Sequence, residues 1–207
     1  MIDFGADTIH VDVMDGTFVP NLTLGAPIVK SLRKFVGPKP FLDCHLMVAH
    51  PGQWVNDFKE AGASGMTVHV ESFASEDEGM SILKKIKEGG MKSGVAVKPK
   101  TAISTVYPFV DAGLVDMILI MTVEPGFGGQ SFMADMMPKV KEARDKYPHI
   151  DIQVDGGLAP STIDQAAESG ANVIVAGSSV YGAKDPESVI RFLREAVLKH
   201  QAPITAQ

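Results

Sequence analysis

The sequence predicts an α/β fold in which strands alternate with helices around a parallel sheet. Short apolar runs rich in Val and Ile alternate with segments of helical periodicity. Nearly the same glycine-containing phrase closes several of those helices, and polar side chains stand at the ends of the strand-like runs. Together these observations favour a (β/α)8 TIM-type barrel over an irregular α/β sheet.

Seven runs have the length and the composition of β-strands. They are short, rich in Val, Ile, Leu and Met, and bounded by residues that favour turns. The predicted strands cover residues 8–13, 41–47, 66–70, 93–97, 117–122, 152–154 and 173–176.

Helical periodicity fills the segments between these strands. The signals for the helix ends include Pro51 and Pro186 in first turns and Ser161 as an N-cap. The predicted helices cover residues 27–36, 51–61, 76–88, 101–110, 137–146, 161–169 and 186–199.

Four helices end in a similar phrase, in which a glycine lets the chain leave the helix with positive φ and enter the next strand. The phrases are Phe4-Gly5-Ala6-Asp7, Ala61-Gly62-Ala63-Ser64, Asp111-Ala112-Gly113 and Ser169-Gly170-Ala171-Asn172. The first of them reads as the end of a helix whose body is absent. We therefore expect a barrel truncated at its N-terminus, without its first strand and most of its first helix.

Length and composition indicate one globular domain. The chain has 207 residues, 45% of them apolar, and a net charge of −6 with a mean hydropathy of +0.09. We expect a single barrel domain over residues 1–199 and a frayed tail over 200–207. The absence of a basic block, of a leader and of a long apolar run argues against nucleic acid and membranes as partners and predicts a cytoplasmic protein. The single cysteine, Cys44, excludes a disulfide framework.

Polar residues alternate with apolar ones in the first two predicted strands. Because side chains at i, i+2 and i+4 share one face of a strand, His10, Asp12 and Met14 point the same way. Asp43, His45 and Met47 repeat this pattern in the next strand, and Asp155 ends the sixth strand. Taken separately, these residues also fit a buried ion pair, a core histidine and a turn aspartate.

In a parallel barrel the carboxyl ends of the strands gather around one opening, where the active sites of such proteins lie. His10, Asp12, His45 and Asp155 would meet there. Two imidazoles and two carboxylates suit one divalent ion, Fe²⁺, Zn²⁺, Mn²⁺ or Co²⁺, and leave room for substrate oxygens.

Glycine-rich loops follow the last three predicted strands. Glycine lets backbone N–H groups approach an anion closely, and the loops after the last strands are the usual phosphate site of this barrel. The loops contain Gly126, Phe127, Gly128 and Gly129, then Gly156 and Gly157, then Gly177 and Ser178. Three such loops in a row predict a phosphorylated substrate.

Other residues near the strand ends have two interpretations each. Met14, Met47 and Met121 fit either the core or an uncharged wall around a planar intermediate. His69 and Glu71 fit a buried ion pair better than catalysis. Glu124 fits a loop hydrogen bond or a base, and Lys98 leaves its strand before a proline and has no assigned role.

Five phrases, in order along almost the whole chain, are similar to those of the ribulose-phosphate 3-epimerase family. They are His10-Val11-Asp12-Val13-Met14-Asp15-Gly16 with Phe18-Val19-Pro20-Asn21, Asp43-Cys44-His45-Leu46-Met47-Val48, Met121-Thr122-Val123-Glu124-Pro125-Gly126-Phe127-Gly128-Gly129-Gln130, Val154-Asp155-Gly156-Gly157 and Ala176-Gly177-Ser178. The third phrase is long enough to be highly specific.

The resemblance implies a (β/α)8 barrel in which His10, Asp12, His45 and Asp155 hold one divalent metal ion. It also implies that Asp12 and Asp155 act as the acid and base pair and that the three methionines pack against the intermediate. The glycine-rich loops, with His45 and Asp155, would bind a phosphorylated pentulose. Family members commonly form oligomers, so the resemblance implies a homo-oligomer, most simply a dimer.

The implied reaction interconverts D-ribulose 5-phosphate and D-xylulose 5-phosphate through a metal-stabilised enediolate. Epimerisation removes a proton from one face of C3 and returns one to the other face, which two carboxylates on opposite sides can do. Another phosphosugar barrel enzyme is an alternative, but the decarboxylases expect Asp-x-Lys where this chain has Asp12-Val13-Met14. A second alternative is a non-catalytic truncated homologue that acts as a binding or oligomerisation partner.

Overall fold

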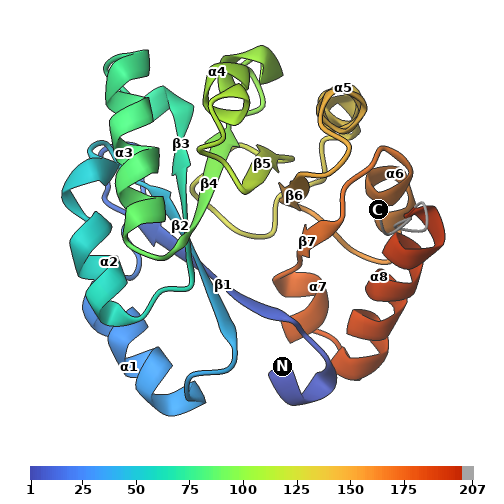
Figure 1. Cartoon of the computed structure of the whole chain (residues 1–207). Coiled ribbons are helices and arrows are strands. Elements are labelled where there is room, and N and C mark those ends of the chain that lie inside the picture. Colours follow the sequence, from blue (N-terminus) through green and yellow to red (C-terminus); the bar gives the residue numbers. More distant parts are fainter. Residues whose placement is uncertain (202–207) are drawn as a thin grey trace.

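In the computed structural model, which describes residues 1–201, seven parallel strands form one sheet with helices on its outer side (Figure 1). Each strand pairs with the next one in sequence, so the sheet order is β1 to β7. The strands are β1 Thr8–Met14, β2 Phe41–Met47, β3 Gly65–His69, β4 Lys92–Val97, β5 Met117–Met121, β6 Asp151–Asp155 and β7 Val173–Val175. The predicted barrel-type α/β fold and its seven strands are confirmed.

Eight α-helices and five short 3-10 helices connect the described strands. The α-helices are α1 Ala26–Val36, α2 Val55–Ala61, α3 Glu76–Glu88, α4 Tyr107–Asp111, α5 Met137–Lys146, α6 Ile163–Glu168, α7 Ser178–Tyr181 and α8 Pro186–His200. The 3-10 helices are η1 Ile2–Phe4, η2 Pro51–Gln53, η3 Val70–Ser72, η4 Ile103–Val106 and η5 Ala134–Met136.

Two predicted helices are each divided into a 3-10 turn and a shorter α-helix. The segment 51–61 begins as η2 before α2, and 101–110 begins as η4 before α4. In the second case Pro108 lies in the first turn of α4, where its missing N–H costs nothing. Sequence periodicity does not distinguish these turns, because both helix types place the same apolar residues against the sheet.

Three details of the prediction need correction. Thr162 rather than Ser161 precedes α6, and the Thr162 hydroxyl accepts a hydrogen bond from the Ala159 N–H in the preceding loop. The segment predicted as a loop at Ser178 forms α7, which has four residues and is too short to show periodicity. His200, which was assigned to the frayed tail, ends α8, and residues 202–207 lie outside the described part of the chain.

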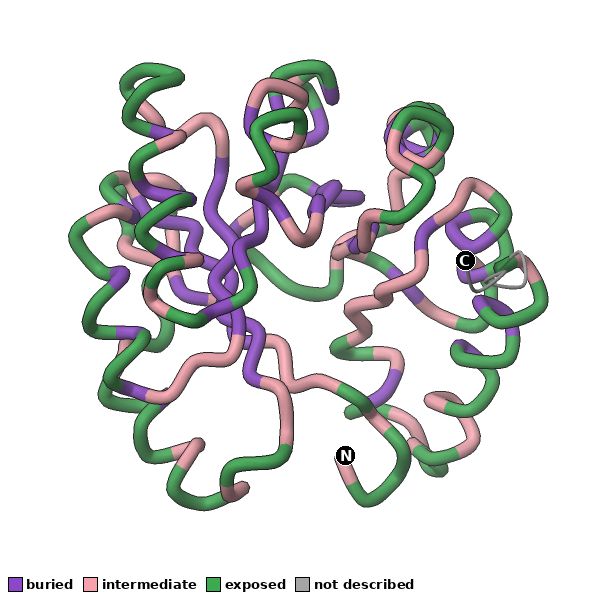
Figure 2. The backbone as a smooth tube through the Cα atoms, viewed as in Figure 1, coloured by how far each residue is buried: buried purple, intermediate pink, exposed green. Residues whose placement is uncertain are grey.

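Strand side chains alternate between the helix layer and the inside of the sheet. Val11 and Val13 belong to the main apolar cluster between strands and helices, as do Leu42, Cys44 and Leu46 of β2. Figure 2 shows the buried positions concentrated along the strands and on the inner sides of the helices. This layer stabilises the fold through apolar burial.

The inside of the curved sheet is partly polar. Asp43, His45, Thr67, His69 and Gln153 are all at most 1% exposed. Such groups are tolerated in a core only when they are hydrogen-bonded or paired with a charge. The apolar part of the interior is a small cluster around β4 and β5 that consists of Ala96, Leu119, Met121 and Val123.

The four predicted glycine turns have the expected conformation. Gly5, Gly62, Gly113 and Gly170 have φ angles of 97°, 86°, 71° and 107°. A side chain at these φ values would be strained, so glycine is the residue that connects each helix end to the following strand.

Two arginines stabilise corresponding turns in the two halves of the sheet. From α1, Arg33 donates to the carbonyls of Gly62 and Pro40 and to the hydroxyl of Ser64. From α5, Arg144 donates to the carbonyl of Gly170 and to the side chain of Asn172 in the same way. The two arginines thus make equivalent contacts, Arg33 before β3 and Arg144 before β7.

The β1 and β7 edges of the sheet are not paired with each other in the described residues. Beside this opening, η1 packs against α8, where Arg194 donates to the Asp7 carboxylate at 2.8 Å. No helix among the described residues is both long and apolar enough to cross a membrane.

Replacing Gly62 should destabilise the fold more than replacing Gly113. An added Cβ at Gly62 would lie 2.8 Å from Cγ of Arg33, whereas nothing lies within 4 Å of one at Gly113. We expect Gly113→Ala to cost about 1 kcal/mol from backbone strain alone, and Gly62→Ala about 2 kcal/mol or more because Arg33 is displaced too. Urea unfolding measures both, and equal losses would contradict the role of Arg33.

Candidate metal centre

Four side chains bring one ligating atom each to a common point at the carboxyl end of the sheet. These atoms belong to His10, Asp12, His45 and Asp155 and all lie within 4.8 Å of one another. Nδ1 of His45 lies 3.1 Å from Oδ1 of Asp12 and 3.4 Å from Nε2 of His10. Oδ2 of Asp155 completes the group at 3.8 Å from Nδ1 of His45 and 3.9 Å from Nε2 of His10.

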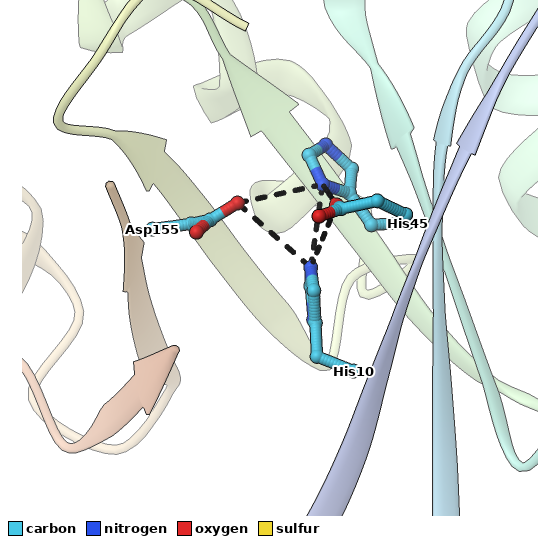
Figure 3. Close-up of side chains that lie close together, drawn as sticks. His10, His45 and Asp155 are labelled. Carbon is cyan, nitrogen blue, oxygen red and sulfur yellow. Dashed lines mark hydrogen bonds and ion pairs between the residues drawn. The ribbon is translucent and has the colours of Figure 1, made fainter. Parts of the chain in front are cut away.

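The sheet register explains why these residues meet. Asp12 on β1 lies directly beside His45 on β2, and His10 lies one pleat below on the same face. Asp155 ends β6 and points across the interior toward the two imidazoles (Figure 3). The four residues predicted from the sequence to converge are therefore brought together.

A buried carboxylate lies behind His10. Nδ1 of His10, the nitrogen that faces away from the cluster, lies 2.8 Å from Oδ2 of Asp43. Asp43 also accepts a hydrogen bond from the side-chain amide of Gln153 at 2.9 Å and one from the hydroxyl of Thr67 at 3.3 Å. An ionised Asp43 therefore keeps the proton of a neutral His10 on Nδ1 and directs the free electron pair of Nε2 toward the cluster.

The charges in the cluster affect one another strongly. Burial opposes the charged form of His10, but the Asp43 charge and hydrogen bonds to Asp12 and Asp43 outweigh it and raise the pKa of His10 well above its usual value. Burial also opposes ionisation of Asp12, yet hydrogen bonds from His10 and His45 lower its pKa. For Asp155, burial raises the pKa. A bound cation would therefore compete with the protons of His10 and Asp155.

This donor set fits a divalent transition-metal ion. Ligands at about 2.0–2.2 Å from a tetrahedral ion are roughly 3.3–3.6 Å apart. The separations that involve His10 or His45 run from 3.1 to 3.9 Å and bracket that value, and all four atoms lie within 4.8 Å of one another. Imidazole nitrogen and carboxylate oxygen suit Zn²⁺, Fe²⁺, Mn²⁺ and Co²⁺.

The three methionines occupy the expected strand ends. Met14 and Met47 are neighbours in the β1–β2 register, and Met121 lies beside Asp155 in the β5–β6 register. Met47 and Met121 are buried, whereas Met14 is partly exposed. They place uncharged surface next to the cluster.

The predicted phosphate glycines fall into two groups. A Cβ at Gly156 would lie 2.4 Å from Val123, and one at Gly157 would lie 2.5 Å from the backbone nitrogen of Phe132. These two glycines are therefore required for packing between the loops after β5 and β6. In contrast, nothing lies within 4 Å of a Cβ at Gly128 or Gly177, so an anion could approach their backbone.

Hydrogen bonds connect the loops around the cluster. The side-chain amide of Asn21 donates to the carbonyl of Gly126 at 2.7 Å, which joins the loop after β1 to the loop after β5. Ser178 lies at the start of α7, and the Ser179 hydroxyl donates to the carbonyl of Leu158. Phe127 is 58% exposed at the tip of its loop.

The sequence predicts the four candidate ligands but not the groups behind them. Asp43 was placed on the correct face without a partner, and Gln153 was not singled out, although it lies two residues before Asp155 and so on the same face of β6. Glu124 is exposed, and its backbone carbonyl, not its carboxylate, accepts from Gln130. Lys98 lies over the ring of Phe18 at 3.7 Å.

The fold and the cluster define a class of protein: a (β/α) barrel with a candidate metal centre at the carboxyl ends of its strands. Residues 1–181 match the model of the "Ribulose-phosphate 3 epimerase family". The chain belongs to the ribulose-phosphate 3-epimerase family, and is thereby classed as an isomerase.

Named relatives agree with this assignment. The "Ribulose-phosphate 3-epimerase, cytoplasmic isoform" of Oryza sativa subsp. japonica is 54% identical over 95% of this chain and 85% of its own length. The ribulose-phosphate 3-epimerase of Candida glabrata is 52% identical over 96% and 85%. That of Mycobacterium tuberculosis H37Rv is 44% identical over 92% and 82%.

Solved structures of more distant proteins share the fold. A 3-hexulose-6-phosphate synthase from Salmonella typhimurium superposes with a TM-score of 0.68 at 23% identity, covering 92% of this chain and 87% of its own. A 3-keto-L-gulonate-6-phosphate decarboxylase from Vibrio cholerae gives 0.64 at 14% identity, over 95% and 100%. At these identities the likeness concerns the fold alone.

Removing one imidazole from the cluster should abolish tight metal binding. We expect the native protein to bind one Co²⁺ or Zn²⁺ per chain in equilibrium dialysis, and His45→Ala to bind at least about 100-fold more weakly because one of four ligands is lost. His149→Ala, at an exposed position, serves as the control and should bind normally. Equal binding by His45→Ala would contradict the assignment of the cluster.

Proposed function

We propose that this chain interconverts D-ribulose 5-phosphate and D-xylulose 5-phosphate by moving protons at C3 between Asp12 and Asp155. One observation carries the proposal: two carboxylates reach the same point from β1 and from β6, strands that are not neighbours in the sheet. A substrate between them would meet one carboxylate on each face.

Each carboxylate has an oxygen to spare for this task. Asp12 and Asp155 contribute Oδ1 and Oδ2 to the cluster, and the protein hydrogen bonds within residues 1–201 do not engage the other oxygen of either side chain. In the forward direction one carboxylate takes the proton from C3 while the C–H electron pair becomes part of an enediolate. The other carboxyl group then donates a proton to the opposite face, and the roles are exchanged in the reverse direction.

His10, Asp12, His45 and Asp155 would hold the divalent ion that this chemistry needs. When bound, the ion supplies Lewis-acid stabilisation of the negative charge that develops on the substrate oxygens. Asp12 and Asp155 would then both ligate the ion and exchange protons with C3, so their position relative to the substrate is fixed by coordination.

The phosphate of the substrate would lie against the loops after β5, β6 and β7. Gly128 and Gly177 have open space where a side chain would be, and backbone N–H groups bind phosphate without a lysine. Met14, Met47 and Met121 would limit water around the intermediate. A cytoplasmic location follows the printed name of the rice relative, and a homodimer is proposed on the family resemblance alone.

Exchange with solvent deuterium tests the two-carboxylate mechanism. In D2O the native protein should incorporate deuterium at C3 of the substrate, and ¹H NMR measures this incorporation. Asp12→Asn and Asp155→Asn should each lower turnover by about 10²- to 10⁴-fold with the fold retained, since an amide cannot accept the proton. Asp145→Asn, at an exposed position on α5, is the control, and near-normal turnover in either cluster variant contradicts the mechanism.

Metal analysis of the same samples separates the enzyme from a non-catalytic partner. Bound metal together with deuterium incorporation supports the epimerase. Bound metal without any incorporation by the native chain would instead favour a binding or oligomerisation partner.

A further inference from the structure

His69 and Glu71 form a hydrogen-bonded chain behind His45. Nε2 of His45, which faces away from the cluster, lies 2.9 Å from Nε2 of His69 on β3. Nδ1 of His69 then lies 3.0 Å from Oε2 of Glu71 in η3. Both imidazoles are fully buried, and their rings stack with centroids 5.0 Å apart. No role in the proposed proton transfer has been given to His69 or Glu71.

Glu71 can only accept hydrogen bonds in this arrangement. Its other oxygen, Oε1, accepts from the backbone N–H of Lys98 at 2.7 Å and from the hydroxyl of Thr101. Burial alone would raise the pKa of Glu71, but the hydrogen bonds from His69, Thr101 and Lys98 outweigh it and lower the pKa to about 2. An ionised carboxylate therefore faces His69, so the proton of His69 must lie on Nδ1.

The proton on Nδ1 of His69 determines which nitrogen of His45 carries a proton. In a neutral His69 ring whose single proton lies on Nδ1, Nε2 carries no proton, and the full burial of the ring disfavours a second proton. Two nitrogens 2.9 Å apart need one proton between them, and it must come from Nε2 of His45. Nδ1 of His45 is thereby left with a free electron pair directed at the cluster.

Without this constraint His45 has an alternative. Oδ1 of Asp12 lies 3.1 Å from Nδ1 of His45 and would accept a hydrogen bond if that nitrogen carried the proton. That tautomer would put a hydrogen atom where the metal must bind. The ligand His10 is oriented by a carboxylate directly, through Asp43, whereas His45 is oriented by a carboxylate through a second imidazole.

We propose that His69 and Glu71 are positioning residues that hold His45 in the tautomer able to bind a metal ion through Nδ1. This role rests on the proposed metal site and accounts for the ability of that site to bind a metal ion. Neither residue contacts the substrate in this role. We therefore expect the affinity for metal to depend on whether residue 71 accepts a hydrogen bond from His69 or donates one to it.

Glu71→Gln reverses the direction with almost no change of shape. The amide oxygen is required where Lys98 N–H and Thr101 donate, so the NH2 group must face Nδ1 of His69. His69 then carries its proton on Nε2, and His45 is forced to carry its own on Nδ1. We expect Co²⁺ to bind about 10- to 100-fold more weakly, and the visible absorption spectrum of bound Co²⁺ to change.

The chain offers a matched control for this substitution. Glu168, the last residue of α6, lies 3.8 Å from Nε2 of His200 at the end of α8. Glu168→Gln makes the same chemical change beside a histidine and should leave Co²⁺ affinity and spectrum unchanged. Circular dichroism and urea unfolding verify that both variants fold.

The tautomers can also be measured directly, without a metal ion. Ring ¹⁵N chemical shifts of the metal-free, histidine-labelled protein near neutral pH should identify His45 as the Nε2–H tautomer and His69 as the Nδ1–H tautomer, and Glu71→Gln should exchange both. The opposite tautomers in the native protein, or unchanged Co²⁺ affinity in a folded Glu71→Gln variant, overturn the inference.

These results are distinguishable from failure of the proposed function. If the native chain binds Co²⁺ and epimerises but Glu71→Gln behaves identically, only the positioning role is wrong. If the native chain binds no metal, the metal site itself is wrong, and the positioning role is overturned with it.

Discussion

The pairing of buried polar groups inside the sheet is the constraint on which the site depends. A carboxylate or an imidazole placed at the core of a barrel costs several kcal/mol unless a partner satisfies it. Here Asp43 is satisfied by His10, Gln153 and Thr67, and Glu71 by His69 and by the loop after β4. The pairing fixes which nitrogen of each ligand imidazole faces the cluster.

The two ligand histidines reach this result by different routes. His10 turns Nε2 toward the cluster and donates a hydrogen bond from Nδ1–H to Asp43, whereas His45 turns Nδ1 toward the cluster and donates one from Nε2–H to His69. In both cases a carboxylate lies at the far end of the hydrogen-bonded path: Asp43, which is buried, and Glu71, which is partly exposed. In each case the nitrogen that faces the cluster is the one without a proton in the neutral imidazole, which is the form that binds metal.

The rest of the fold separates stability from chemistry. Apolar side chains between strands and helices, such as Val11, Leu42 and Ile118, stabilise the barrel, and Arg33 and Arg144 stabilise the turns at its amino end. The loops at the carboxyl end are then free to carry glycine and partly exposed residues such as Phe127. This division allows an interior with several charged groups to remain folded.

Local signals in the sequence determined the strands, the long helices, the glycine turns and the convergence of His10, Asp12, His45 and Asp155, because period-two alternation and the parallel barrel together fix which side chains meet. These local signals do not predict the 3-10 turns, α7 or the packing role of Gly156 and Gly157, since these features depend on contacts between distant segments. The tertiary structure alone showed that Gln153 supports Asp43 from 110 positions away and that His69 and Glu71 stand behind His45. Hydrogen-bond direction is a property of atoms brought together by folding, and no spacing in one chain records it.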